Sequence, residues 1–174
     1  TTSIPYGETS DTNPINVYAK SKLVGEAAAI NNNKNSVIIR TNIFGCKPGM
    51  LADWAIQSYK DNKKIDGYVN VQFNPVYVGD LAVAIRKTID HDITGVINVA
   101  GDTCLSKYHF LKLLYKRFNM DTEMIRPKTY DDHGQELKRP KYTCLQTGLF
   151  EKEFDHIFSL DQGLDKLFEE YKEE

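Results

Sequence analysis

The sequence predicts an α/β fold in which strands alternate with helices along the chain. Two apolar runs, residues 36–44 and 95–101, lack polar alternation and are therefore typical of strands buried on both faces of a parallel sheet. Between and after these runs, apolar residues recur at helical spacing. Two such strands are too few for a complete parallel sheet, so the pattern indicates part of one.

The first predicted helix follows Pro14, which fixes its own φ and restricts the residue before it. Tyr18 and Lys22 lie four residues apart on this helix and therefore share one face. A lysine ammonium beside a phenol favours the phenolate, so Tyr18 is a candidate proton donor or acceptor. Two other pairs have the same spacing and are interpreted as solvated helix faces: Tyr59 with Lys63, and Tyr108 with Lys112.

The remaining elements are predicted from local signals. Polar and turn-forming residues predict a loop over 1–12. Apolar residues at helical spacing, some behind a capping residue, predict helices over 51–60 with Trp54 in packing contact, over 81–90 behind Asp80, from Ser106 through Phe118, and over 161–172. Short strands are predicted at 69–73 and 124–126, and the polar stretch 128–141 is expected to be a binding loop.

The composition excludes several classes of partner. A formal charge of −2 offers no basic face for nucleic acid and no polybasic patch for a membrane. No apolar run approaches the roughly 20 residues of a transmembrane helix, and no signal peptide opens the chain, so we expect a cytoplasmic protein. The four histidines are scattered without the spacing of metal ligands, so no metal site is predicted.

The cysteines point to the same compartment. Cys46, Cys104 and Cys144 are odd in number, far apart and free of a CxxC pair. This usage predicts unpaired thiols in a reducing compartment, not a disulfide framework.

A glycine-rich phosphate-binding turn is missing from the sequence. Neither G-x-G-x-x-G nor G-x-x-G-x-x-G occurs in the chain. A dinucleotide needs such a turn so that backbone N–H groups and a helix N-terminus approach its pyrophosphate. The sequence therefore predicts that this chain does not bind a dinucleotide pyrophosphate through a glycine-rich turn.

Four ordered runs resemble one enzyme family. They are Asn13-Pro14-Ile15-Asn16-Val17-Tyr18-Ala19-Lys20-Ser21-Lys22-Leu23-Val24-Gly25-Glu26, Arg40-Thr41-Asn42-Ile43-Phe44-Gly45, Asn74-Pro75-Val76-Tyr77-Val78-Gly79-Asp80-Leu81-Ala82 and Lys138-Arg139-Pro140-Lys141-Tyr142-Thr143. The first resembles the active-site helix of the extended short-chain dehydrogenase/reductases. Within that family the chain is most similar to the dTDP-4-dehydrorhamnose reductase group, and only to the C-terminal part of its fold.

The resemblance implies the C-terminal part of a Rossmann-type doubly wound α/β fold plus a small substrate-binding α/β lobe, without the N-terminal dinucleotide-binding strands. Residues 1–50 would form the end of the Rossmann core, and 51–174 mainly the substrate lobe with a core strand returning near 95–101. The family's catalytic serine or threonine lies at a position that the 17 residues before Tyr18 do not reach. We therefore expect a fragment that is inactive alone.

The resemblance also implies roles for individual residues. Tyr18 would donate a proton to a carbonyl oxygen while NADPH or NADH delivers hydride to its carbon. Lys22 would assist Tyr18 and hold the nicotinamide ribose, so both residues would contact the cofactor. Asn42 would contact the substrate, or else satisfy backbone groups at a strand end. Arg139 would bind a nucleotide diphosphate, or else be a surface arginine before a turn proline.

Three functions stay open at this point. The leading one is NAD(P)H-dependent reduction of a 4-keto deoxy sugar nucleotide. A nucleotide-sugar epimerase or dehydratase of the same superfamily would use the same tyrosine. A non-catalytic subunit that resembles the regulatory subunit of methionine adenosyltransferase would bind an enzyme partner instead. The sequence leaves both the sugar and the oligomeric state open, with a homodimer as one option.

Overall fold

The computed structural model describes residues 4–45, 47–131 and 138–173 and has the mixed α/β fold that the sequence predicts. Its helices are α1 (Val17–Asn32), α2 (Leu51–Lys60), α3 (Val78–Asp90), α4 (Lys107–Arg117), α5 (Gly148–Phe154) and α6 (Leu160–Glu173). Its strands are β1 (Val37–Thr41), β2 (Ile43–Phe44), β3 (Ile65–Tyr68), β4 (Gln72–Phe73), β5 (Val76–Tyr77), β6 (Gly95–Val99), β7 (Leu105–Ser106) and β8 (Ile125–Lys128).

β1 and β6 come from the two apolar runs and pair in parallel. Their register runs from Val37 opposite Gly95 to Thr41 opposite Val99. Gly95 opens β6 with a φ of +81°, a left-handed conformation that glycine adopts without strain. β2 and β5 also pair in parallel, with Ile43 opposite Val76 and Phe44 opposite Tyr77.

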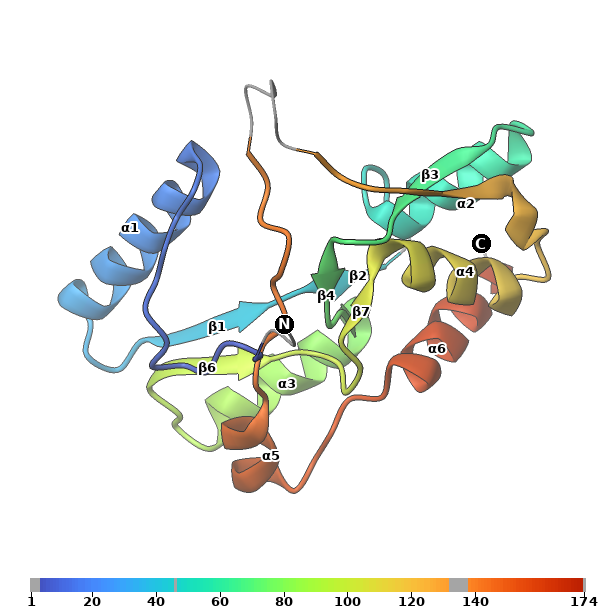
Figure 1. Cartoon of the computed structure of the whole chain (residues 1–174). Helices are drawn as coiled ribbons and strands as arrows, with labels where there is room; N and C mark the ends of the chain where they lie inside the picture. Colours follow the sequence, from blue (N-terminus) through green and yellow to red (C-terminus); the bar gives the residue numbers. More distant parts are fainter. Residues whose placement is uncertain (1–3, 46, 132–137, 174) are drawn as a thin grey trace.

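A second α/β unit encloses the larger hydrophobic core. β3 pairs with β8 in parallel and β4 with β7 in antiparallel fashion. Figure 1 shows α2, α4 and α6 gathered with these strands on the right, while α1 lies at the left beside β1. The buried side chains of this core include Phe44, Ile56, Phe73, Phe110, Leu111, Leu114, Tyr115, Leu164 and Leu167.

A smaller core joins β6 to α3 and α5. Its buried members are Val76, Ala84, Ile97, Val99, Phe150 and Phe158. Gly101, just after β6, lies so close to the Pro75 carbonyl oxygen that a Cβ there would clash with it. The connection after β6 can therefore pass close to Pro75 because residue 101 is glycine.

The helix predicted to begin after Asp80 begins earlier in the structure. Asp80 is not the N-cap of its helix, because α3 already begins at Val78, directly after Tyr77 of β5. Asp80 instead lies in the first turn, is buried, and forms an ion pair with Lys166 of α6. The hydrogen bond between the Tyr77 hydroxyl and Glu170 (2.6 Å) adds a second link to α6.

The structure also contains elements that the sequence analysis missed, namely β3, α5, the two-residue strand β7 and a 3-10 helix over Thr122–Met124. In β3, Asp66 and Gly67 interrupt the apolar pattern on which strand prediction depends. Helix α5 has only seven residues, shorter than the window over which helical periodicity is readable. Trp54, expected to pack, is 45% exposed on α2.

The α1–β1 unit is only partly covered by the described chain. No residue of α1 is buried, and Val17 and Val24 expose more than half of their surface. All five residues of β1 are only half-buried, and within the described residues β1 pairs with β6 on one edge alone. A parallel strand of this composition is normally buried on both faces.

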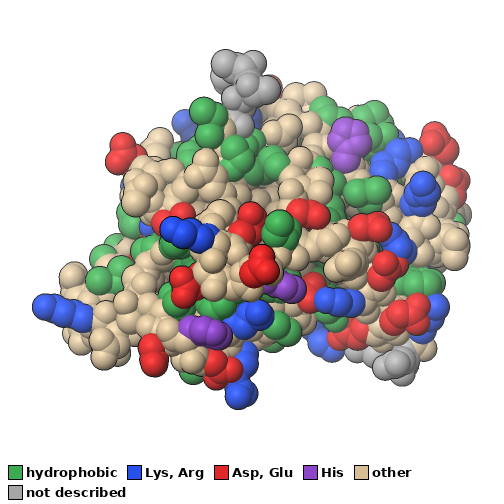
Figure 2. All heavy atoms as spheres, turned by 90° about the horizontal axis from the view of Figure 1, so that it is seen from below, with side chains coloured by type: hydrophobic (Ala, Val, Ile, Leu, Met, Phe, Trp, Pro, Cys, Tyr) green, Lys and Arg blue, Asp and Glu red, His purple; other side chains and the backbone are tan. Residues whose placement is uncertain are grey.

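The lower face of the molecule carries mixed charge. Figure 2 shows acidic and basic side chains interspersed over this face, without one dominant sign. Among the described residues, no helix has both the length and the apolar character needed to cross a membrane.

Candidate functional site

The predicted catalytic pair lies on the exposed face of α1. The Asn16 side chain accepts a hydrogen bond from the Ala19 N–H (2.8 Å) and so caps the helix that begins at Val17. Tyr18 is 71% exposed, and the Lys22 Nζ lies 5.3 Å from the centroid of its ring. The two side chains therefore share one solvent-facing surface, as their spacing predicts.

An ion pair anchors α1 to β1. The Arg40 guanidinium donates to both carboxylate oxygens of Glu26, with the shortest contact at 2.7 Å, and to the Glu8 carbonyl at 3.2 Å. The hydrogen bond with Glu26 raises the pKa of Arg40, so this cation stays charged at any physiological pH. Since α1 has no buried residue, this pair is a principal contact that fixes the orientation of the Tyr18 face.

Residues 138–146, here called the returning segment, are held by four asparagines from distant parts of the chain. Side-chain amides donate to its backbone carbonyls from Asn16 (to Lys138, 2.8 Å), Asn42 (to Thr143, 2.8 Å), Asn74 (to Leu145, 2.8 Å) and Asn98 (to Gln146, 3.0 Å). An asparagine amide offers both donors and an acceptor, so it can replace a strand partner for an isolated backbone segment.

Asn42 is used within this network. Its Nδ2 also contacts the Asn74 Oδ1 at 3.3 Å, and its Oδ1 accepts from the Thr143 hydroxyl at 3.3 Å. These contacts match the interpretation of Asn42 as a strand-end asparagine that satisfies backbone groups. Its contact with substrate stays a prediction.

Arg139 lies on the returning segment, close to the start of α1. Its backbone N–H donates to the Tyr130 hydroxyl at 3.2 Å, and the Tyr130 backbone exchanges two hydrogen bonds with the side chain of Asn70. The Asn16 bond to Lys138 ties the preceding residue to the helix that carries Tyr18. The guanidinium itself is exposed, and its contact with a diphosphate stays a prediction.

Asn74 and Asn98 are two buried polar residues that the sequence analysis did not single out. Asn74 is 4% exposed and Asn98 is fully buried. Asn74 bonds the Leu145 N–H and carbonyl as well as the Gly101 carbonyl, so it joins the returning segment to the end of β6. A readable signal was present, because each asparagine follows or interrupts an apolar strand run, where a polar side chain needs a partner.

The cysteine prediction is wrong. Cys104 and Cys144 form a disulfide, with Cα atoms 5.8 Å apart, although 40 residues separate them in sequence. They meet because the returning segment runs beside β4, whose other edge pairs with β7 directly after Cys104. Cys104 is exposed and Cys144 is buried, so the bond ties a surface loop to an interior strand-like segment. The third cysteine, Cys46, lies outside the described residues.

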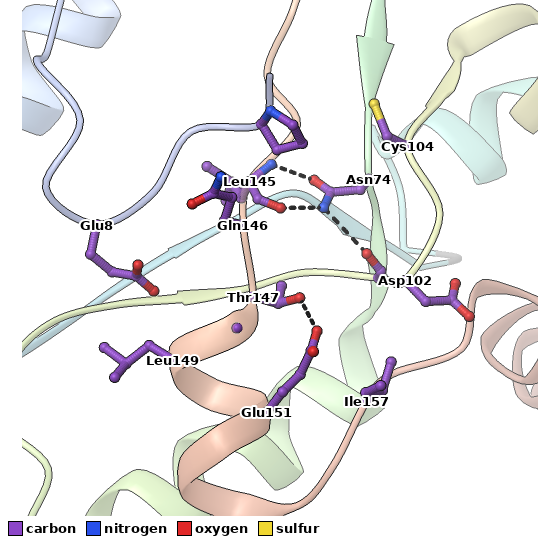
Figure 3. Close-up of a pocket in the computed structure, with 13 residues that line it drawn as sticks. Glu8, Asn74, Asp102, Cys104, Leu145, Gln146, Thr147, Leu149, Glu151 and Ile157 are labelled. Carbon is purple, nitrogen blue, oxygen red and sulfur yellow. Dashed lines mark hydrogen bonds between the residues drawn. The ribbon is translucent and has the colours of Figure 1, made fainter. Parts of the chain in front are cut away.

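A pocket of about 630 Å³ opens at the carboxyl end of β6, on the α5 side of the returning segment. Figure 3 shows Glu8, Asp102 and Glu151 around it, with Thr147 and Glu151 hydrogen-bonded to each other and Asn74 bonded to Leu145. Its lining contains carboxylates and no lysine or arginine, so it does not suit a phosphate group. None of the predicted site residues Tyr18, Lys22, Asn42 and Arg139 lines this pocket.

Comparison with known proteins gives relatives whose names indicate different functions. The chain is 26% identical over 148 residues to the dTDP-4-dehydrorhamnose reductase of Mycolicibacterium smegmatis, covering 82% of this chain and 45% of the relative. It is 30% identical over 161 residues to methionine adenosyltransferase 2 subunit beta of Xenopus tropicalis, covering 87% and 48%. The chain thus spans about half the length of these relatives.

Solved structures support the same fold. The dTDP-4-dehydrorhamnose reductase of Bacillus anthracis, solved in complex with NADP, superposes with a TM-score of 0.87 at 27% identity and covers 95% of this chain and 59% of its own. A reductase orthologue from Clostridium acetobutylicum gives a TM-score of 0.89 at 23% identity, with 98% and 61% coverage, a likeness of fold. A sequence profile of the RmlD substrate binding domain matches residues 1–173. The chain therefore belongs to the RmlD substrate binding domain family.

Proposed function

We propose that this chain is the substrate-side half of an NAD(P)H-dependent reductase that acts on a 4-keto deoxy sugar nucleotide. The observation that carries the proposal is the exposed Tyr18–Lys22 face on α1, whose N-cap residue is bonded to the returning segment beside Arg139. A hydrogen bond thus links the helix that carries the proton donor Tyr18 to the segment that carries the candidate phosphate-binding residue Arg139. The likeness to the NADP-bound reductase of Bacillus anthracis supports the same reaction class.

The residues of this chain fit one end of a nicotinamide dinucleotide. Tyr18 and Lys22 are presented together on a helix without buried residues, where they could hold a ribose through its hydroxyl groups. The pyrophosphate end has no matching glycine-rich turn in the sequence. When bound, the cofactor would supply hydride to the substrate carbon.

The proton chemistry falls to Tyr18. Its hydroxyl would give a proton to the carbonyl oxygen as that oxygen becomes a hydroxyl, and the phenolate left behind would later take a proton from solvent. The Lys22 ammonium on the same face would stabilise this phenolate. The exposure of both groups leaves room for substrate above them.

The uncovered α1–β1 unit supports the proposal that more of the sheet belongs to this protein. Residues 1–50 would then be the end of the Rossmann core and 51–174 mainly the substrate lobe, with β6 as the returning core strand. The second edge of β1 and the apolar side chains of α1 would pair with further strands and helices. We expect the 174-residue chain alone to self-associate, and neither to bind a dinucleotide nor to reduce a keto sugar.

The decisive experiment uses the longer protein that contains this chain. Oxidation of NADPH and NADH is measured with a panel of 4-keto sugar nucleotides, for the wild type and for Tyr18→Phe. General acid catalysis contributes about 10²–10⁴-fold, so kcat of Tyr18→Phe should fall at least 100-fold without loss of stability. Tyr108→Phe is the matched control, because Lys112 lies 5.7 Å from its ring in the same i, i+4 arrangement. A Tyr18→Phe variant within a few-fold of wild type would remove the assignment.

A second candidate function rests on the 30% identity to methionine adenosyltransferase 2 subunit beta. In that case the protein would act by binding an enzyme partner, and its Tyr18 would have no catalytic role. The same assay separates the two, because a binding subunit would oxidise neither cofactor with any keto sugar nucleotide. A change in the activity of a methionine adenosyltransferase on addition of the protein would then favour the second candidate.

A further inference from the structure

The disulfide joins two segments that the rest of the structure holds very differently. Cys144 is fully buried in the returning segment, and its carbonyl accepts a hydrogen bond from the Tyr6 N–H (2.9 Å). The next residue, Leu145, donates its N–H to the Asn74 Oδ1 (3.0 Å), and its carbonyl accepts from the Asn74 Nδ2 (2.8 Å). The chain around Cys144 is therefore held in place by hydrogen bonds that do not need the disulfide.

The other half of the bond belongs to residues 102–104, here called the rim loop. The start of this loop is fixed, because the Asp102 N–H donates to the Phe158 carbonyl (2.9 Å) and the Asp102 Oδ1 accepts from the Leu160 N–H (3.1 Å). Within the described residues, the backbone of Thr103 and Cys104 forms no hydrogen bond with another segment. The disulfide is therefore the main restraint on the end of the rim loop before β7 begins.

The rim loop contributes to the pocket of about 630 Å³ at the carboxyl end of β6. Asp102 and Cys104 line this pocket, and so do Leu145 and Gln146 of the returning segment. Figure 3 shows these residues on two separate segments, one that follows β6 and one that leads into α5. The disulfide thus ties together two segments that line the same pocket, and it restrains the less firmly held one.

We propose that the Cys104–Cys144 disulfide is a thiol-responsive clamp on this pocket. While the bond is intact, the rim loop is held against the returning segment. Reduction releases the rim loop and loosens the edge of the pocket, whereas the returning segment keeps its own hydrogen bonds. The clamp does not depend on the proposed function, because none of the residues proposed for that function lines the pocket.

The exposure of the two cysteines determines how the bond is opened. Cys104 is exposed whereas Cys144 is fully buried, so a thiolate of a dithiol reductant attacks the Cys104 sulfur. A mixed disulfide forms with Cys104, and the Cys144 sulfur leaves and takes up a proton. The second thiol of the reductant then attacks its own sulfur in the mixed disulfide, which closes a cyclic disulfide and frees the Cys104 thiol. The reductant loses two electrons and two protons, and the protein gains them.

The first arm of the test measures whether the native protein is reduced and which thiol appears at the surface. The longer protein that contains this chain is treated with dithiothreitol without denaturant and alkylated with iodoacetamide, and labelled peptides are quantified by mass spectrometry. We expect Cys104 to be alkylated at least tenfold faster than Cys144, because Cys144 stays buried. Circular dichroism confirms that the reduced protein is folded. Resistance of the bond to reduction without denaturant, or equal alkylation of the two cysteines, overturns the inference.

The second arm measures hydrogen exchange of the oxidised and reduced protein. Amides of residues 102–105 should exchange at least tenfold faster after reduction, whereas those of 141–146 should change by no more than a few-fold. Cys104→Ser should show the faster exchange in both buffers, and the control Cys46→Ser should behave as the wild type. Equal exchange of the rim loop in both states, or an equal increase over 141–146, contradicts the clamp. Neither arm uses cofactor or sugar nucleotide, so the clamp and the proposed function fail or stand separately.

Discussion

Loss of the Cys104–Cys144 disulfide should lower the free energy of unfolding by a large fraction of the total. The bond closes a loop with a sequence separation of 40 residues, which includes all of α4 and β8. The chain-entropy relation for a loop of that length gives about 4 kcal/mol at 25 °C, and measured effects span about 0–5 kcal/mol. A domain of this size has about 5–15 kcal/mol of stability in total.

Cys104→Ser is the appropriate perturbation because Cys104 is exposed, so a serine hydroxyl there can be hydrated. Replacing the buried Cys144 would instead add the cost of burying a hydroxyl. Unfolding in urea is followed by circular dichroism and by the fluorescence of Trp54, the single tryptophan. In oxidising buffer the variant should be less stable than the wild type by about 4 kcal/mol, whereas in reducing buffer the two should coincide.

The control is Cys46→Ser, which should retain the full difference between oxidising and reducing buffer. Peptide mapping of the unreduced protein should recover a cross-linked pair that contains Cys104 and Cys144. Equal stability of the wild type in both buffers, or recovery of both cysteines as free thiols after air oxidation, would refute the reasoning.

Three further predictions concern single side chains. Lys22→Met should lower kcat of the longer protein, because it removes the ammonium that lies 5.3 Å from the ring centroid of Tyr18. An unchanged kcat would make Lys22 a surface residue. Asn74→Ala should lower the free energy of unfolding in urea by about 2–4 kcal/mol, because it leaves the Leu145 and Gly101 backbone groups buried without partners. The control Asn32→Ala, at an exposed position, should change it by no more than about 0.5 kcal/mol. The pKa of Lys107 is about 8 in the folded state, below the 10.5 of a free lysine, so the unfolded state binds more protons between these values and stability should rise with pH across that window. Lys107→Met should lack this rise, and parallel pH profiles for variant and wild type would contradict the assignment.

Helices and strands were predictable where their formation depends on a short run of neighbouring residues. The bounds 51–60 agree with α2, and the Ser106 hydroxyl accepts from the His109 N–H as an N-cap does. Apolar runs without alternation identified β1 and β6, and these two strands do pair in parallel. The spacing of Tyr18 and Lys22 placed them on one helix face, since helical geometry alone brings i and i+4 together.

Errors arose where neighbouring elements compete for the same residues. Asp80 reads as an N-cap, but the β5 pair continues to Tyr77 and the helix follows at once, which moves Asp80 into the first turn and toward Lys166. The short strand β3 was missed because two of its four residues, Asp66 and Gly67, belong to types that are depleted in strands. Its alternating burial is supplied by β8 and α4, which lie elsewhere in the chain.

The sequence by itself determined the α/β class, most helices and the placement of Tyr18 and Lys22 on one helix face, because each depends on residues within a few positions of one another. Only the tertiary structure decided which side chains meet around the returning segment. Asn16 bonds Lys138 across 122 residues, Cys104 bonds Cys144 across 40, and Asn42 bonds the Thr143 carbonyl across 101. Such contacts join a single side chain to a distant backbone or side chain, so they leave no periodic pattern in the sequence. The Cys104–Cys144 bond, for example, forms only once β4 has brought β7 and the returning segment to its two edges.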